Sequence, residues 1–147
     1  METSLDFASE IREKLSLKDV DPVGMSPLVL AYIGDAIYEV VVRTKIVSDS
    51  TATVHKLHNM SALLVKAHAQ AEMIKSLELT EEEERIYKRG RNAKSYTKAK
   101  NATLADYRNA TGFEALMGYL YLSGQTDRML ELIQNGMEHY QNSAEEK

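Results

Sequence analysis

Apolar residues recur along most of the chain every three to four positions, which is the period of an α-helix. Only two prolines and seven glycines interrupt this pattern, and no segment indicates a strand. The sequence therefore predicts an all-α fold of about six helices in one domain spanning residues 1–147. We expect frayed ends at about residues 1–3 and 142–147.

Capping residues and helix breakers predict the limits of these helices. The expected helices cover about 4–14, 27–46, 53–77, 81–89, 106–122 and 126–141. Ser26 suits an N-cap because its side chain can accept a free backbone N–H, and Pro27 suits the position after it. Thr80 and Glu83 form a capping box, and Gly90 is typical of the residue after a helix end. Residues 91–101 are then expected to form a polar loop.

The second predicted helix has almost no polar face, so it should be buried nearly all round. It nevertheless carries Asp35 and Glu39, one helical turn apart on the same face. Buried carboxylates need a cation, either a lysine or arginine from another element or a bound metal. Gly34 costs about 1 kcal/mol of helix stability relative to alanine, which indicates that another group approaches the backbone there.

A second isolated acid, Glu114, lies in the apolar segment 111–122. Spacing alone favours an ion pair with a basic residue for either acid, but lone acids in two apolar helices shift the balance toward a metal site. Mg²⁺ takes oxygen ligands, commonly one or two carboxylates with waters and phosphate oxygens. Such an ion activates water and stabilises charge on a phosphoryl group, so a phosphate ester is the expected substrate.

Charge is unevenly distributed along the chain. The net charge of −4 argues against a protein that coats nucleic acid indiscriminately. A cationic segment without acids nevertheless spans residues 85–100, and we expect it to dock one anionic partner. The residues predicted to contact RNA are Arg85, Lys88, Arg89, Arg91, Asn92, Lys94, Lys98 and Lys100.

The absence of cysteine excludes disulfides and thiolate metal sites and fits a reducing compartment. The first residues lack the basic and apolar runs of a leader, and no segment approaches the ~20 apolar residues that cross a bilayer. We therefore expect a cytoplasmic protein with no membrane partner.

Two segments resemble motifs of the ribonuclease III family. Residues 30–41 (LAYIGDAIYEVV) resemble its signature helix, and residues 113–122 (FEALMGYLYL) resemble its second acidic motif. The two occur in the family's order with RGRNAK at 89–94 between them, and the similarity covers essentially residues 20–140. The chain ends one helix beyond the second motif, so we expect it to lack the family's double-stranded-RNA-binding domain.

The resemblance implies an endonuclease domain that forms a homodimer through the signature helix and requires Mg²⁺, with Mn²⁺ as a substitute. It implies hydrolysis of phosphodiesters in double-stranded RNA to leave 5′-phosphate and 3′-hydroxyl ends, in maturation of the large-subunit (23S) ribosomal RNA. By position, Asp35 and Glu114 carry over as catalytic metal ligands and Glu39 as an additional candidate ligand. A ribosomal-protein helper is a further candidate partner, one that the sequence does not reveal.

The chain departs from the larger family at two positions, where Ala31 and Thr111 replace acids. This leaves open whether one or two ions bind. Asp106 is no replacement, because eight helical residues place it about 12 Å along the axis from Glu114, and we interpret it as an N-cap. His55, His58 and His68 are interpreted as surface or interface residues, since no carboxylate is expected to complete a metal site around them.

Two further functions stay open from the sequence. A catalytically silent helical RNA-binding dimer would have kept the fold and lost too many acids. A helical Mg²⁺-dependent nucleotide pyrophosphatase would explain the acids but not the cationic segment.

Overall fold

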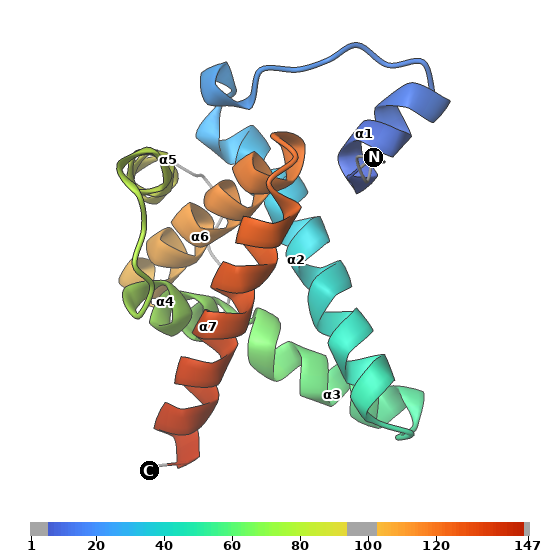
Figure 1. Cartoon of the computed structure of the whole chain (residues 1–147). Coiled ribbons are helices and arrows are strands. Elements are labelled where there is room, and N and C mark those ends of the chain that lie inside the picture. The colour runs from blue at the N-terminus through green and yellow to red at the C-terminus, as the bar shows by residue number, and fades with distance from the viewer. Residues whose placement is uncertain (1–5, 94–102, 146–147) are drawn as a thin grey trace.

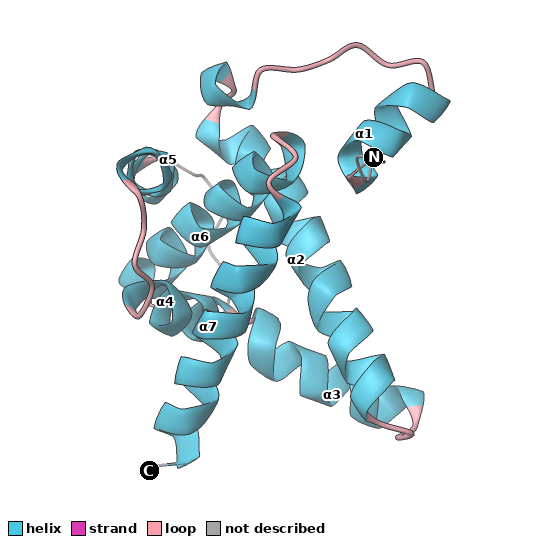
Figure 2. Cartoon of the chain, in the orientation of Figure 1, coloured by secondary structure: helices cyan, strands magenta, loops and turns pink. Residues whose placement is uncertain are grey.

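The structure is a computed structural model that describes residues 6–93 and 103–145. These residues form helices joined by short connections and contain no strand, which confirms the predicted all-α fold (Figure 2). The elements are α1 (Phe7–Lys14), the 3-10 helix η1 (Pro22–Gly24), α2 (Pro27–Asp49), α3 (Val54–Val65), α4 (Ala67–Lys75), α5 (Glu81–Asn92), α6 (Leu104–Leu122) and α7 (Thr126–Glu145). Among them, no helix has both the length and the apolar character needed to cross a membrane.

Helix α6 is the centre of the fold. Helices α2, α4, α5 and α7 pack around it, and α1 lies to one side at the end of an extended connection (Figure 1). Every residue from 110 to 121 is buried except Glu114. Close packing on all sides of an apolar helix stabilises it through burial of its side chains. The acid is thus the one position on this stretch of α6 that is open in part to solvent.

The burial of helix α2 differs from the burial that the sequence predicted. Its buried residues, which include Leu30, Tyr38 and Val42, form one side of the helix. The opposite side leaves a set of large apolar residues open to solvent, here called the apolar stripe: Leu28, Val29, Tyr32, Val40 and Val47. The prediction that α2 is buried nearly all round is therefore wrong for the single chain.

The third predicted helix, over 53–77, is two helices in the structure. Lys66 has an extended backbone (φ −68°, ψ 154°) that ends α3 and begins α4. The Gln70 amide nitrogen donates a hydrogen bond to the Val65 carbonyl at 2.9 Å, which supplies a partner to the broken end of α3. No proline or glycine marks this break. Val54 and Met60 of α3 are exposed.

Two predicted helix ends are also wrong. Gly90 lies inside α5 rather than after it, because α5 packs so closely on α6 that a Cβ at Gly90 would come 2.8 Å from the Ala115 Cβ. Helix α7 runs to Glu145, four residues past its expected end at 141. The glycine therefore serves helix packing and not helix termination.

The predicted caps are correct in part. The capping box of Thr80 and Glu83 is present at the start of α5, and Arg128 of α7 also donates to the Glu83 carboxylate at 2.8 Å. Ser26 is the N-cap residue of α2 but its side chain makes no capping hydrogen bond. The first helix begins at Phe7 after the cap Asp6, later than predicted.

Candidate active site

Two glycines bring α2 and α6 into backbone contact. A Cβ on Gly34 would lie 1.7 Å from the Glu114 carbonyl oxygen, and a Cβ on Gly118 would lie 2.0 Å from the Leu30 carbonyl oxygen. Neither position has room for a side chain. The close approach predicted at Gly34 is therefore present, and the approaching group is the backbone of the second acid, Glu114. Asp35, the next residue on α2, is placed beside that acid.

The Asp35 side chain lies close enough to the Glu114 carboxyl group to act on its pKa. Burial is the largest cause that raises the pKa of Glu114 to about 9, and the hydrogen bond and negative charge of Asp35 raise it further. Asp35 itself is exposed. Glu114 is consequently protonated at neutral pH unless a cation joins the pair.

No lysine or arginine within 6–93 and 103–145 forms a salt bridge with either Asp35 or Glu114. Glu39, by contrast, accepts a 2.7 Å hydrogen bond from Arg43 on its own helix. The structure thus brings together two of the three predicted acids. The third already has a cationic partner.

Gln70 is a member of this site that sequence reasoning missed. Its side chain is 1% exposed and acts to lower the pKa of the Glu114 carboxyl group. The amide oxygen is buried with no hydrogen-bond partner in the described part of the chain. No local signal marks Gln70 in the sequence, because α4 mixes alanines with polar and charged residues and only the fold buries this amide.

Two buried aromatic residues, one on α2 and one on α6, pack against each other near the acids in the sequence. The Tyr38 hydroxyl donates to the Leu64 carbonyl at 2.7 Å, and its ring meets Phe113 edge-on at 5.2 Å between centroids. Tyr38 belongs to α2 and Phe113 to α6, and each lies within three residues of a site acid. This contact fixes the two helices relative to each other and to α3.

The two positions where the larger family has acids carry no acid here and have structural contacts instead. Ala31 is 8% exposed and packs in the core. Thr111 is also 8% exposed, and its hydroxyl donates to the Tyr107 carbonyl of its own helix at 3.0 Å. The carboxyl pair at this crossing therefore comes from Asp35 and Glu114.

The cationic residues of α5 make different kinds of contact. Arg85 pairs with Glu82 at 2.6 Å and Lys88 pairs with Glu84 at 3.2 Å, both on the exposed surface of the helix. Exposed pairs of this kind contribute at most about 1 kcal/mol, so these side chains can exchange partners readily.

Two other arginines of α5 contact other residues of the chain. Arg89 donates to the carbonyls of Val23 and Met25 at 3.1 and 3.2 Å and joins α5 to the turn before α2. Arg91 lies 5.6 Å from the centre of the Tyr87 ring and donates to the exposed Asn92 at 3.3 Å. The remaining predicted RNA contacts, Lys94, Lys98 and Lys100, lie outside the described residues.

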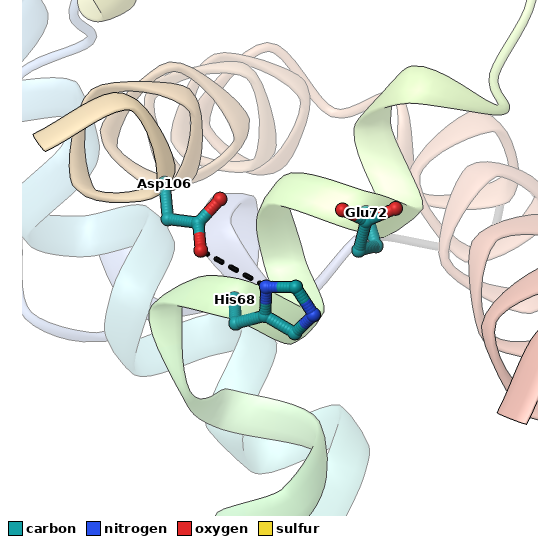
Figure 3. A group of neighbouring side chains, drawn as sticks. All are labelled: His68, Glu72 and Asp106. Carbon is teal, nitrogen blue, oxygen red and sulfur yellow. Dashed lines mark hydrogen bonds and ion pairs between the residues drawn. The ribbon is translucent and has the colours of Figure 1, made fainter. Parts of the chain in front are cut away.

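The interpretation of Asp106 as an N-cap is wrong, and so is the expectation that no carboxylate lies near the histidines, although His68 is exposed as predicted. The N-cap of α6 is Thr103, whose side chain accepts a hydrogen bond from the backbone N–H of Asp106. The Asp106 carboxylate instead contacts His68 Nδ1 at 2.9 Å, and Glu72 lies close to both (Figure 3). Carboxylates therefore do gather around one of the three histidines, because the break after α3 turns α4 toward the start of α6.

Comparison with known proteins agrees with this geometry. The family model described as the Ribonuclease III domain matches residues 28–125. The chain is 49% identical over 124 residues to a Mini-ribonuclease 3 of Clostridium tetani, covering 82% of each chain. It is 46% identical over 136 residues to a Mini-ribonuclease 3 of Thermoanaerobacter, covering 91% of this chain and 94% of the relative.

A crystal structure of a protein from Fusobacterium nucleatum has the same fold, with a TM-score of 0.71 and 28% identity over 79% of this chain and 94% of that one. The chain belongs to the ribonuclease III family, a family of endoribonucleases. Both relatives described above are named Mini-ribonuclease 3. The resemblance found in the two acidic motifs is therefore confirmed.

Proposed function

We propose that this chain is a Mg²⁺-dependent endoribonuclease of double-stranded RNA, with Asp35 and Glu114 as its catalytic metal ligands. The observation that carries the proposal is the carboxyl pair at the crossing of α2 and α6, which has no cationic partner among the described residues. Two neighbouring carboxyl groups are a typical arrangement for a divalent ion, whose binding releases the proton that one of them carries.

The residues fit such an ion. Asp35 is exposed and gives solvent access, whereas Glu114 is half-buried and held by α6. When bound, the ion would supply a water of lowered pKa and neutralise charge on the phosphoryl group. The Gln70 side chain would orient the Glu114 carboxyl group. Glu39 remains a candidate additional ligand, and it would have to leave Arg43 to serve as one.

We propose the homodimer on the basis of the apolar stripe. Tyr32 is 81% exposed and Val47 is 63% exposed on the same helix that carries Asp35. An exposed apolar surface of this kind is typical of a protein interface. A second copy of this chain, docked through its own α2, would cover both stripes and place two carboxyl pairs on one assembly. Two sites on one duplex could each cut one strand.

The cationic residues of α5 and of the segment after it support an RNA substrate. An A-form duplex is recognised mainly by its shape and through phosphate and 2′-hydroxyl contacts, which suit arginine and lysine. Arg85 and Lys88 are exposed and only loosely paired, so we propose them as phosphate contacts together with Lys94, Lys98 and Lys100. Arg89, Arg91 and Asn92 would be held nearby by their contacts within the protein.

The relatives are named Mini-ribonuclease 3, which supports a ribonuclease acting in a bacterial cell. We propose the precursor of 23S ribosomal RNA as the substrate, 5′-phosphate ends as the products and the cytoplasm as the location. Labelling the 5′ end generated by cleavage of a precursor transcript would test the product chemistry.

Cleavage of a structured RNA duplex by the full chain with Mg²⁺ tests the proposal. Asp35→Asn and Glu114→Gln should each lower the rate by on the order of a thousandfold, because each removes a ligand worth several kcal/mol of transition-state stabilisation. Glu138→Gln, which neutralises an exposed acid of α7, is the matched control and should cleave normally. If the wild type binds the duplex and leaves it as intact as the variants do, the silent RNA-binding dimer is the better interpretation.

Salt dependence tests the RNA contacts separately. Replacing Lys94 and Lys98 by alanine should weaken duplex binding and reduce the slope of log affinity against log salt by roughly one unit per lost phosphate contact. The control is Lys18→Ala, an exposed lysine between α1 and α2. An unchanged slope would remove these lysines from the interface.

A further inference from the structure

A second group of metal-ligating side chains lies apart from the carboxyl pair. His68 and Glu72 extend from α4 and Asp106 extends from α6 toward them (Figure 3). Their ligand atoms all lie within 4.8 Å of one another, and in the described ranges 6–93 and 103–145 no other trio of such residues gathers this closely.

The three side chains are presented by fixed backbone. His68 and Glu72 are four residues apart on one helix, so they lie on one face, one turn from each other. Asp106 is in the first turn of α6, where the Thr103 cap holds its backbone N–H. The Asp106 side chain is 16% exposed and the His68 side chain is 52% exposed, so one ligand is firmly packed and another is open to solvent.

The donor set differs from that of the catalytic pair. Imidazole nitrogen with carboxylate oxygens suits zinc, cobalt, nickel or iron, whereas Mg²⁺ selects oxygen ligands. Metal–ligand bonds to these atoms are about 2.0–2.2 Å long, so two ligands of one tetrahedral ion lie about 3.3–3.6 Å apart. The ligand atoms lie within 4.8 Å of one another, so rotations of the side chains would be needed to bring them onto one ion.

The geometry points to a second divalent-metal site, formed by His68, Glu72 and Asp106, that takes a transition metal of the zinc class. Two carboxylates lie near one imidazole here. Lys75 neutralises part of their negative charge through an exposed 3.2 Å ion pair with Glu72. A surface pair of this kind is weak, so a divalent ion would displace the lysine.

This site is distinct from the catalytic one. Asp106 precedes Glu114 by eight helical residues, which is about 12 Å along the axis, so one ion does not serve both. The bound ion would join α4 to the first turn of α6. Gln70, which contacts Glu114, lies between His68 and Glu72 on α4. The site would therefore stabilise the two helices that hold the catalytic glutamate without touching the substrate.

Zinc titration of the chelator-treated full chain in saturating Mg²⁺ tests this inference. We expect one Zn²⁺ per chain, and a rise in unfolding midpoint of roughly 5–10 °C when free Zn²⁺ exceeds Kd a hundredfold. His68→Ala should weaken zinc binding by roughly tenfold or more, and Asp106→Asn should do the same. The matched control is His58→Ala, which removes an exposed histidine of α3 and should bind zinc like the wild type.

The double variant Asp35→Asn/Glu114→Gln separates the two sites. It should keep the zinc affinity of the wild type and show the same cobalt absorption spectrum when Co²⁺ replaces Zn²⁺. His68→Ala should lose that spectrum, and because its histidine is exposed it serves even if Asp106→Asn fails to fold. Zinc affinity that survives His68→Ala, disappears in the double variant or is absent from the wild type would overturn the inference.

Discussion

Helices α2 and α6 are alike in sequence, since each is predominantly apolar and each carries an isolated acid of the site. Their surroundings are not alike. Helix α6 is enclosed by other helices of the chain, and every residue from 110 to 121 except Glu114 is buried. Helix α2 is enclosed on one side only, and on the other side it exposes the apolar stripe, with Tyr32 81% accessible.

The difference shows that apolarity along a helix does not predict burial within the single chain. The chain itself supplies the cover of α6. The described part of the chain leaves the apolar stripe of α2 open, and the proposed second copy would cover it. The two acids differ accordingly, because Glu114 takes its raised pKa from burial within the chain whereas Asp35 stands exposed next to the surface we propose as the dimer contact.

The strongest disruption of this arrangement is at the crossing itself. Gly34→Ala should destabilise the fold by about 3 kcal/mol or more, because the new methyl group would lie 1.7 Å from the Glu114 carbonyl oxygen and the helices must separate. Urea unfolding followed by circular dichroism measures the loss. Gly24→Ala is the control, since no atom lies within 4 Å of a Cβ there, and it should remain within about 0.5 kcal/mol of the wild type. Equal stability of the two variants would contradict the close crossing.

The next effect concerns the exposed side of α2. Tyr32→Asp should weaken the dimer about 30-fold or more, the effect of losing an aromatic residue at the centre of an interface, and should leave the monomer folded. Sedimentation velocity over a concentration series measures this change. Leu63→Asp alters an exposed residue of α3 that is 58% accessible and outside the stripe, so it should sediment as the wild type does. A Tyr32→Asp protein that stays dimeric would place the interface elsewhere.

Sequence periodicity was sufficient for the fold class and for most helices, because each of these is stabilised by an amphipathic or apolar pattern of its own. It failed at Lys66 and Gly90, where tertiary contacts override local preference. A lysine gave no signal of a break, and the glycine that suggested a helix end instead allows α5 to pack on α6. The hydrophobic pattern of one helix does not predict which other helix packs against it.

The candidate site could likewise be predicted only in part. Asp35 and Glu114 could be found because lone acids in apolar helices are unusual, and Gly34 because glycine in a helix is costly. Gln70 and Asp106 could not, since their roles depend on the turn of α4 toward α6 after Lys66. The contact of Asp106 with His68 joins residues 38 positions apart. No spacing rule relates them.

Smaller effects should appear in the dependence of stability on pH. In metal-free protein the pKa of Glu114 is raised from 4.5 to about 9, so between these values the native state keeps a proton that the unfolded chain releases. The contribution of Glu114 to the free energy of unfolding is complete below pH 4.5. It decreases as pH rises toward 9, by at most about 1.4 kcal/mol per pH unit.

Unfolding in EDTA across this range, compared between wild type and Glu114→Gln, measures the contribution. The glutamine variant carries no titrating group at this position, so the stability of the wild type should decline relative to it as pH rises. Mg²⁺ added at pH 8 should restore the wild type and have little effect on the variant, because the metal requires the deprotonated carboxyl pair. Parallel curves for the two proteins would contradict the raised pKa of Glu114.

The smallest expected effect is at Gln70. Gln70→Met keeps the length of the side chain but removes the amide contact that lowers the pKa of Glu114. The alkaline shift of this pKa should move the rising limb of the pH–rate profile to higher pH and reduce cleavage near neutrality by roughly threefold to tenfold. A general loss of packing would lower the rate equally at every pH. Thr111→Val is the control, because its buried hydroxyl bonds only to its own helix, and its profile should not move.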